Sequence, residues 1–253
     1  MPLIAIVSAM PEENEGLLKD LSITESSIAG QRIYHRGILY GQEVVLVCSR
    51  WGKVAAAATV AHLLAKYPVG ELIFTGVAGA VNPSLKVGDV VIGTELLQHD
   101  LDARPLFSRY EIPMLGCTHL GADPSSTQAL EQAARWFVSR MKRTPDWDRA
   151  RTAFRLDEAR VHSGLIVSGD RFFQSSTQIA HLRSELPDAL CVEMEGAAVA
   201  QVCKEHGTRF SVVRTISDAG DDQAHHDFGR FIQEVASAYS TGIIQALLSG
   251  SNV

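Results

Sequence analysis

Short apolar runs alternate along the chain with longer stretches in which apolar residues recur at helical spacing. The short runs predict β-strands at residues 3–8, 32–39, 43–48, 71–75, 89–93, 159–167, 189–192 and 210–216. The longer stretches predict helices at residues 12–21, 53–66, 127–141, 177–185, 195–206 and 228–248. Gly30 and Tyr40-Gly41 are typical of a hairpin meander among the early strands. The later strands lie between helices, which favours an α/β fold with a mixed central β-sheet flanked by helices on both faces.

Length and composition narrow the class of protein. A chain of 253 residues fits one large domain better than two small ones, and no linker or repeat divides it. The net charge of −6 disfavours a nucleic-acid or anionic-membrane surface. No apolar run reaches the roughly 18 residues of a membrane span, and the first residues lack the basic segment of a signal peptide. Four widely spaced cysteines without a C-x-x-C motif favour a reducing, cytoplasmic location.

Glu193 and Glu195, separated only by Met194, are the most unusual feature of the sequence. They lie between the apolar run 189–192 and the small-residue run 196–200, and neither flank has the composition of a solvated segment. A carboxylate buried in such surroundings costs several kcal/mol unless it is paired or used. These two acids are therefore candidates for a functional site.

Polar residues also follow other predicted strands. In an open α/β sheet, ligands bind outside the carboxyl ends of the strands. Four strands end in polar or glycine-rich sequences, at residues 8–13, 75–80, 193–195 and 217–222, and the last strand carries Arg214 before it reaches Asp218. Residues 75–79 form neither a Walker A loop nor a full G-x-G-x-x-G motif, so a tight strand-to-helix turn and a ligand loop both remain open. We expect one site where these ends meet.

Two other polar stretches have plainer interpretations. His99-Asp100 and His225-His226-Asp227 lack a partner cluster at ligand spacing, so we expect no metal or cofactor. Residues 140–155 carry six basic side chains against Asp146 and Asp148. We interpret this stretch as a solvated connection between a helix and a strand, with a phosphate or partner contact as the alternative.

Three motifs occur in order along the second half of the chain: VSGDRF at 167–172, VEMEGAA at 192–198 and VRTISD at 213–218. Together with residues 9–13, 51–56, 75–79, 85–91 and 99–102, they resemble the 5'-methylthioadenosine/S-adenosylhomocysteine nucleosidases of the purine nucleoside phosphorylase-like superfamily. The resemblance covers nearly all of a single domain spanning residues 1–253, except for an apparent insertion at about 144–156. It implies a nucleoside phosphorylase-like fold, a homodimer, and hydrolysis of an adenine nucleoside in methionine salvage and S-adenosylmethionine recycling.

The same resemblance implies a role for each acid. Asp218 would protonate or hydrogen-bond adenine N7, which makes the purine a better leaving group. Glu195 would bind the ribose 2'- and 3'-hydroxyls and stabilise the cationic transition state. Glu13 would activate the attacking water, and Arg214 would hold the acids as a bidentate partner.

Further positions of the pocket follow from the resemblance. Phe172 would stack on adenine, the backbone at Phe173 would read the edge of the base, and Met194 would pack against ribose. The pocket for the 5'-thio substituent would be lined by Met10, Trp51 and Phe228. The remaining substrate-binding positions would be Val77, Ala78, Gly79, Glu193 and Ser217. A loop of the second subunit, residues 102–113, would close the site with Phe107, Tyr110 and Pro113.

Simpler roles remain open for several of these residues. Glu12 could replace Glu13 as the catalytic acid, Glu195 could serve only the helix dipole, and Asp218 could cap a turn. Core packing is the alternative for Phe172, Met194, Phe228 and Trp51. Three positions depart from the residues we expect in the family: Val77 (often Ser), Trp51 (a smaller aliphatic) and Arg104 (a small polar residue).

Three other functions compete with this interpretation. A phosphorylase needs cations around its phosphate, whereas residues 10–13 place acids there. A nucleosidase for futalosine, adenosine or a nucleotide would use the same acids with a different 5' pocket. A catalytically inactive nucleoside-binding protein would bind without releasing adenine.

Overall fold

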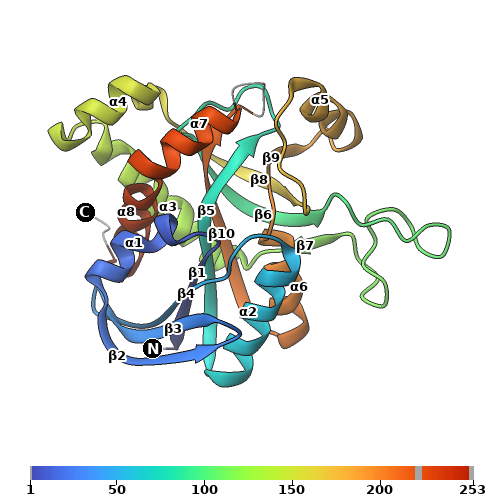
Figure 1. Cartoon of the computed structure of the whole chain (residues 1–253), viewed down its shortest axis with the longest axis horizontal. Coiled ribbons are helices and arrows are strands. Elements are labelled where there is room, and N and C mark those ends of the chain that lie inside the picture. Colours follow the sequence, from blue (N-terminus) through green and yellow to red (C-terminus); the bar gives the residue numbers. More distant parts are fainter. Residues whose placement is uncertain (1, 220–223, 251–253) are drawn as a thin grey trace.

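The computed structural model describes residues 2–219 and 224–250, and its strands form one mixed sheet that partly closes on itself (Figure 1). Gly220, Asp221 and Asp222, and the side chains of Asp146 and His225, lie outside what is described. The strands within the described residues are β1 (Leu3–Ser8), β2 (Ser22–Ala29), β3 (Arg32–Leu39), β4 (Gln42–Cys48), β5 (Val69–Ala80), β6 (Val90–Gln98), β7 (His119–Gly121), β8 (Val161–Ser168), β9 (Ala189–Glu193) and β10 (Arg209–Asp218).

The pairing of the strands gives the sheet two parts. β5, β10, β6, β8 and β9 pair in a closed ring, because β5 bonds β10 along one edge and the end of β9 along the other. β1, β4, β3 and β2 extend from β5 as an open sheet that ends at β2. β1 and β10 both run parallel to β5, so the carboxyl ends of these three strands meet at the same edge.

Helices cover both faces of the sheet, as the sequence predicts. The helices are α1 (Pro11–Asp20), α2 (Lys53–Lys66), α3 (Pro124–Met141), α4 (Asp148–Phe154), α5 (Ser176–Glu185), α6 (Gly196–His206), α7 (Ala224–Phe231) and α8 (Ser237–Leu248). One core cluster unites α2 and α6 with the sheet, and a second unites α1, α3 and α8 with its other face (Figure 1). None of the described helices combines the length and the apolar character that a membrane crossing requires.

Some strand predictions were wrong. β2 was missed because its sequence SITESSIA is polar and mostly exposed, so pairing with β3 rather than burial holds it. The short β7 was missed as well. The predicted strand 71–75 continues to Ala80, so residues 75–79 form no turn at all. Backbone pairing with β10 and then with β9 carries the strand through its glycines.

The stretch at residues 140–155 leads from the end of α3 toward β8, and its described side chains other than Met141 are exposed or half-buried, as a solvated connection requires; the prediction did not include its regular structure. The stretch contains a 3₁₀ turn (Pro145–Trp147) and α4, and a second 3₁₀ turn (Leu156–Glu158) follows it. Trp147 packs edge-to-face on Phe137 and Tyr239, with ring centroids 5.6 Å apart in each pair. Leu156 is completely buried. The basic side chains obscured these apolar anchors in the sequence.

The C-terminal helix also differs from the prediction. It begins at Ala224 rather than at residue 228, and a π-helical turn (Ile232–Ala236) joins α7 to α8. The other predicted helices agree with the structure to within three residues at each end. As a result, Phe228 lies within α7 rather than at the start of a helix.

Candidate active site

The carboxyl ends of β1, β9 and β10 and the last residues of β5 surround one cavity. Its lining consists of Ala9, Met10, Glu13, Trp51, Val77, Ala78, Gly79, Phe172, Val192, Glu193, Met194, Glu195, Ser217, Asp218 and Phe228. The structure therefore brings together three acids that lie far apart in the sequence, Glu13, Glu195 and Asp218, and they face a common space. Most of the predicted substrate-binding positions lie in the same wall.

Glu13 lies in the first turn of α1, directly after β1. Its side chain is buried, and one carboxylate oxygen accepts hydrogen bonds from the backbone N–H groups of Ala9 (2.8 Å) and Met10 (2.9 Å). The other oxygen accepts from the N–H of Val77 (3.0 Å) on β5. Burial raises the pKa of Glu13, against the lowering influence of Arg214 and these N–H groups. The neighbouring Glu12 is exposed, so the structure places Glu13 rather than Glu12 in the cavity.

Glu195 immediately precedes α6 and is 5% exposed. Its carboxylate accepts a hydrogen bond of 2.7 Å from the backbone N–H of Gly52, which comes from the loop before α2. Burial, and then the charge of Glu193, raise the pKa of Glu195 well above its ordinary value. The carboxyl group is therefore fixed at the cavity wall and is easily protonated.

Glu193 holds the turn between β9 and α6. Its carboxylate accepts hydrogen bonds from the N–H groups of Glu195 (3.1 Å) and Gly196 (2.8 and 2.9 Å) and from the hydroxyl of Ser168. It also forms an ion pair of 2.7 Å with Arg214, in which both side chains are buried. Although Glu193 lines the cavity, both of its oxygens are bound by the protein.

Arg214 lies behind the cavity wall and is 1% exposed. One guanidinium nitrogen donates to Glu193 (2.7 Å) and another donates to the carbonyl of Val213 (3.3 Å). The predicted bidentate hold on the acids is not seen: among the described residues, one nitrogen of Arg214 bonds an acid. The guanidinium also stacks over Phe74, 4.0 Å from the ring centroid, which is a favourable environment for a buried cation.

Asp218 is the last residue of β10 and is 2% exposed. Its carboxylate accepts a hydrogen bond of 2.8 Å from the hydroxyl of Ser217. The pairing of β10 with β5 shifts register between Ile216 and Asp218, so Asp218 lies opposite Gly79. The register shift turns the last carboxylate of β10 toward the cavity.

The glycines of β5 leave room for these acids. A Cβ atom on Gly76 would lie 2.6 Å from Oε1 of Glu13, and a Cβ atom on Gly79 would lie 3.0 Å from Oδ1 of Asp218. Because real Cβ atoms essentially never approach so closely as 2.6 Å, a larger residue at Gly76 would displace the Glu13 carboxylate. The glycine-rich segment is thus a strand that makes room for protein carboxylates, and its residues Val77, Ala78 and Gly79 line the cavity.

Four buried carboxyl groups lie close together at this site, those of Glu13, Glu193, Glu195 and Asp218. Arg214 is the one buried Lys or Arg side chain among the described residues, and it pairs with Glu193. Burial raises the pKa of both Glu13 and Glu195, so these two carboxyl groups take up protons more readily than solvated glutamates.

Aromatic side chains form part of the cavity wall. Phe228 packs edge-on against Trp51 (6.2 Å between ring centroids) and against Phe172 (5.5 Å). The cavity volume is about 70 Å³, below the roughly 300–1,000 Å³ of typical small-molecule pockets. Trp51 is 54% exposed and lies at the rim, so it is not a core residue.

Several predicted positions lie elsewhere in this chain. The ring of Phe173 packs against His99 with centroids 5.4 Å apart, outside the cavity lining. Phe107 and Pro113 belong to the segment between β6 and β7, which projects from the body of the molecule (Figure 1). Tyr110, in the same segment, packs against a core cluster of its own chain. These three residues do not line the cavity of their own chain.

Gly52 and Ser168 are site residues that sequence reasoning missed. Gly52 has φ +91°, a conformation that side chains rarely adopt, and this directs its N–H to Glu195. Ser168 donates to Glu193 and accepts from the N–H of Ala197 (2.7 Å). Gly52 directly precedes α2 in the motif WGK, and Ser168 is the last residue of β8 in the motif VSGD.

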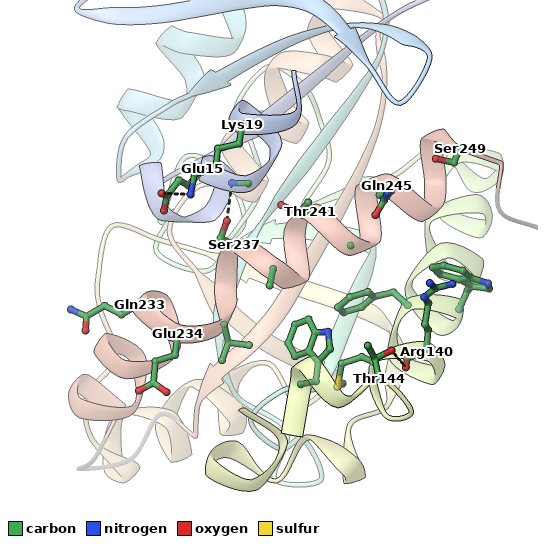
Figure 2. Close-up of a pocket in the computed structure, with 18 residues that line it drawn as sticks. Glu15, Lys19, Arg140, Thr144, Gln233, Glu234, Ser237, Thr241, Gln245 and Ser249 are labelled. Atoms are coloured by element: carbon green, nitrogen blue, oxygen red, sulfur yellow. Dashed lines mark hydrogen bonds and ion pairs between the residues drawn. The ribbon is translucent and has the colours of Figure 1, made fainter. Parts of the chain in front are cut away.

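A larger cavity, about 610 Å³, lies between α1, α3 and α8 (Figure 2). Its charged side chains include Glu15 and Lys19, which form an exposed ion pair of 2.8 Å. No group of three or more His, Cys, Asp or Glu within the described ranges is arranged to hold a metal ion. The buried acids, rather than volume, therefore distinguish the smaller cavity as the candidate active site.

Comparisons with known proteins agree with this geometry. A family model described as the Phosphorylase superfamily matches residues 3–249. The 5'-methylthioadenosine/S-adenosylhomocysteine nucleosidase of Anoxybacillus flavithermus is 34% identical over 98% of this chain and 99% of its own. The crystal structure of the nucleosidase of the same name from Neisseria meningitidis, in complex with methylthio-immucillin-A, has a TM-score of 0.86 and 33% identity and covers 99% of this chain and 100% of its own.

A related enzyme with another name has a similar structure. The futalosine hydrolase of Helicobacter pylori is 27% identical, with a TM-score of 0.82 and coverage of 98% of both chains. From the family match and the relatives above 30% identity, this chain belongs to the phosphorylase superfamily and, within it, to the family of the 5'-methylthioadenosine/S-adenosylhomocysteine nucleosidases.

Replacement of Gly76 by Ala tests the packing of the acids against β5. We expect Gly76→Ala to lower the free energy of unfolding by about 1–3 kcal/mol, because its Cβ would overlap Glu13. Gly121→Ala is the matched control, since a Cβ on Gly121 would meet no atom within 4 Å. Urea unfolding of both variants measures the difference. Equal stability of the two variants would contradict the packing.

Replacement of Glu195 by Gln tests the raised pKa. Folding raises the pKa of Glu195 above the value of 4.5 that it has when solvated, so the unfolded chain releases this proton first as the pH rises. Ionisation of Glu195 therefore lowers the stability of the wild type above about pH 5. Gln cannot ionise but can accept the hydrogen bond from Gly52.

We expect Glu195→Gln to be more stable than the wild type at about pH 8, with an advantage of about 1.4 kcal/mol per unit of pKa displacement, and to lose this advantage near pH 5. The exposed Glu12→Gln is the control, and its effect should stay within about 0.5 kcal/mol at both pH values. Denaturant unfolding at the two pH values provides the measurement. A Glu195→Gln effect that does not change with pH would refute the shift.

Proposed function

We propose that this chain hydrolyses the N-glycosidic bond of 5'-methylthioadenosine, S-adenosylhomocysteine or both, releasing adenine and the 5-thioribose product. The observation that carries the proposal is the meeting of Glu13, Glu195 and Asp218 at one cavity. The names of the relatives support the substrate. In a cell, this reaction belongs to methionine salvage and S-adenosylmethionine recycling, in the cytoplasm.

Asp218 acts as the acid for the leaving base. A purine leaves more readily when N7 is protonated or accepts a strong hydrogen bond, and acid catalysis of this kind contributes about 10²–10⁴-fold. This role requires that the carboxyl group of Asp218 carry a proton when the base leaves. The hydroxyl of Ser217 orients the carboxyl group.

Glu195 binds the ribose hydroxyls. In the part of the chain that the structure describes, Gly52 is the one hydrogen-bond donor to this carboxylate, so acceptor capacity remains for a substrate. As the bond to the base breaks, positive charge develops on the sugar, and a nearby carboxylate stabilises it. Substrate binding therefore favours the ionised form of Glu195.

Glu13 activates the attacking water. Three backbone N–H groups fix its carboxylate, so it needs no reorganisation during the reaction. Its raised pKa makes it a better proton acceptor near neutral pH than an ordinary glutamate. An acid and a base on opposite sides of the sugar follow the logic of inverting glycosidases.

Hydrolysis explains the site better than phosphorolysis. Among the described residues that line the cavity there is no Lys or Arg, and Arg214 behind the wall is already bound to Glu193. Phosphate would therefore enter a space bordered by acids, whereas water tolerates them. The presence of all three acids likewise argues against a protein that only binds nucleosides.

Futalosine is the second candidate substrate, because a futalosine hydrolase has a similar structure. The part of the cavity that would receive the 5' substituent of the substrate has an apolar wall, which suits a thioether. This wall is formed by Met10, Trp51 and Phe228. The side chain of Val77 lacks the hydroxyl group that a serine would place in this wall. Trp51 is exposed at the rim, so the orientation of its ring determines whether a bulky 5' substituent fits. Relative rates with methylthioadenosine, S-adenosylhomocysteine, adenosine and futalosine distinguish the substrates.

A homodimer completes the pocket in this proposal. The projecting segment with Phe107, Tyr110 and Pro113 would reach the cavity of a second subunit. Exposed apolar side chains support an interface, namely Leu106 (84% exposed) and Met114 (91%) on this segment and Val54 (80%) beside Trp51.

The test is to incubate the purified protein with methylthioadenosine in phosphate-free buffer and to identify both products. We expect adenine and free methylthioribose at full rate, because water is the nucleophile. Asp218→Asn and Glu13→Gln should each lower kcat by about 10²–10⁴-fold while retaining ligand binding. The exposed neighbour of Glu13 provides the control, Glu12→Gln, which should keep wild-type kcat.

Absolute dependence on phosphate, with a sugar phosphate as product, would refute hydrolysis. Wild-type turnover by Glu13→Gln or Asp218→Asn would remove that residue from the mechanism. Binding of methylthioadenosine without any adenine release would identify a binding protein.

A further inference from the structure

A groove lined by basic side chains follows the C-terminal half of α3. It has a volume of about 460 Å³ and lies between α3 and the start of β8. Its polar lining includes Arg135, Lys142 and Arg143 from α3 and the residues just after it, and Arg160 and His162 from the β8 side. We call this feature the basic groove. No Asp or Glu occurs among its described lining residues.

The basic groove continues into a neighbouring hollow. A hollow of about 340 Å³ shares Ser139 and Arg143 with it and adds Arg140 and Thr144. Figure 2 shows Arg140 and Thr144 across α8 from Glu15 and Lys19, on the far side of the large cavity. The cations therefore form a continuous strip around the end of α3.

Most of these cations have no acidic partner. Arg135 pairs with Glu131 (2.6 Å), and His162 lies 3.3 Å from the buried Asp89. Within the described ranges, no ion pair of 4.0 Å or less joins Arg140, Lys142, Arg143 or Arg160 to a carboxylate. The chain carries 29 acids against 23 Lys and Arg residues, so a shortage of acids does not explain this.

The helix dipole explains only part of the cluster. The carbonyl end of α3 attracts cations in and after its last turn, which accounts for Arg140, Lys142 and Arg143. It does not account for Arg160, which comes from the strand side and faces the same groove. Like charges brought together from two elements repel each other, so their convergence is better explained by a ligand than by folding.

We propose that the basic groove binds a small molecule with several adjacent phosphate groups. Arg and Lys are the side chains that bind phosphate oxygens best, and Arg does so through paired N–H groups. Three unpaired cations in the groove, together with Arg140 in the adjoining hollow, match a ligand with several negative charges. The groove volume of about 460 Å³ lies within the range of small-molecule pockets. A concave groove fits such a ligand better than it fits a flat membrane surface.

This site is separate from the proposed active site. None of the groove's lining residues lines the cavity of Glu13, Glu195 and Asp218. The inference therefore does not depend on the reaction catalysed, and each can fail without the other.

The experiment is calorimetric titration of the whole protein with inorganic tripolyphosphate at low salt. We expect one site per chain, with an affinity that falls at least about tenfold between 50 and 300 mM salt, because ions screen exposed charges. The double variant Arg143→Ala/Arg160→Ala should weaken binding by at least about tenfold. The control Arg183→Ala/Lys204→Ala removes two exposed cations outside the groove and should stay within about twofold.

Further measurements separate the possible outcomes. Thermal unfolding and methylthioadenosine hydrolysis should be unchanged in Arg143→Ala/Arg160→Ala, so lost binding would not reflect misfolding. Titration with ATP while the active site is saturated with adenine tests whether an organic phosphate binds as well; loss of this binding in the groove variant would support the site.

Three results would overturn the proposal. The first is no binding of tripolyphosphate at low salt, and the second is equal binding by the groove and control variants. The third is binding of citrate, a tricarboxylate of similar size, as tightly as tripolyphosphate. Sedimentation with phosphatidylglycerol vesicles that depends on Arg143 and Arg160, without tripolyphosphate binding, would instead identify a membrane contact.

Discussion

Arg214 and Glu193 form a buried ion pair on which the arrangement of the acids depends. The pair joins the last strand of the closed ring to the turn before α6, and Glu195 is two residues away in that turn. Removal of one partner of such a pair leaves an uncompensated buried charge and costs about 3–5 kcal/mol. The pair holds Glu193, and burial raises the pKa values of the nearby Glu13 and Glu195. These raised pKa values are the physical basis of the proposed acid–base chemistry.

The glycines of β5 make this crowded arrangement possible. Gly76 and Gly79 provide the space that the carboxyl groups of Glu13 and Asp218 occupy, while β5 continues to pair with β10. Glu13 and Asp218 thus come from different parts of the chain, and β5 lies between them without a side chain at Gly76 or Gly79 that would displace either carboxyl group. Stability is given up at this point for function, since glycine weakens a strand and buried acids oppose folding.

Much of this arrangement could be predicted from strand ends alone. Charged residues after apolar runs indicated Glu13, Glu195 and Asp218. The parallel pairing of β1 and β10 with β5 explains why Glu13 and Asp218 meet, whereas Glu195 reaches the same place because the end of β9 pairs antiparallel with the end of β5. The glycine-rich segment was misinterpreted because glycine usually marks a turn, and only tertiary packing reveals the acids beside it. Trp147 and Leu156 were missed for a related reason: each anchors a segment whose other side chains are mostly polar. Gly52 could not be predicted because its role depends on one backbone N–H.

The central claim is that Glu13, Glu195 and Asp218 act on one nucleoside from different sides. A crystal structure of the Asp218→Asn variant with methylthioadenosine tests it most directly, because slow turnover preserves the substrate. The account predicts N7 of adenine at residue 218, the ribose hydroxyls on Glu195, and a water held by Glu13 on the opposite face of the sugar. A nucleoside bound with its ribose away from Glu195, or in the large cavity between α1, α3 and α8, would contradict it.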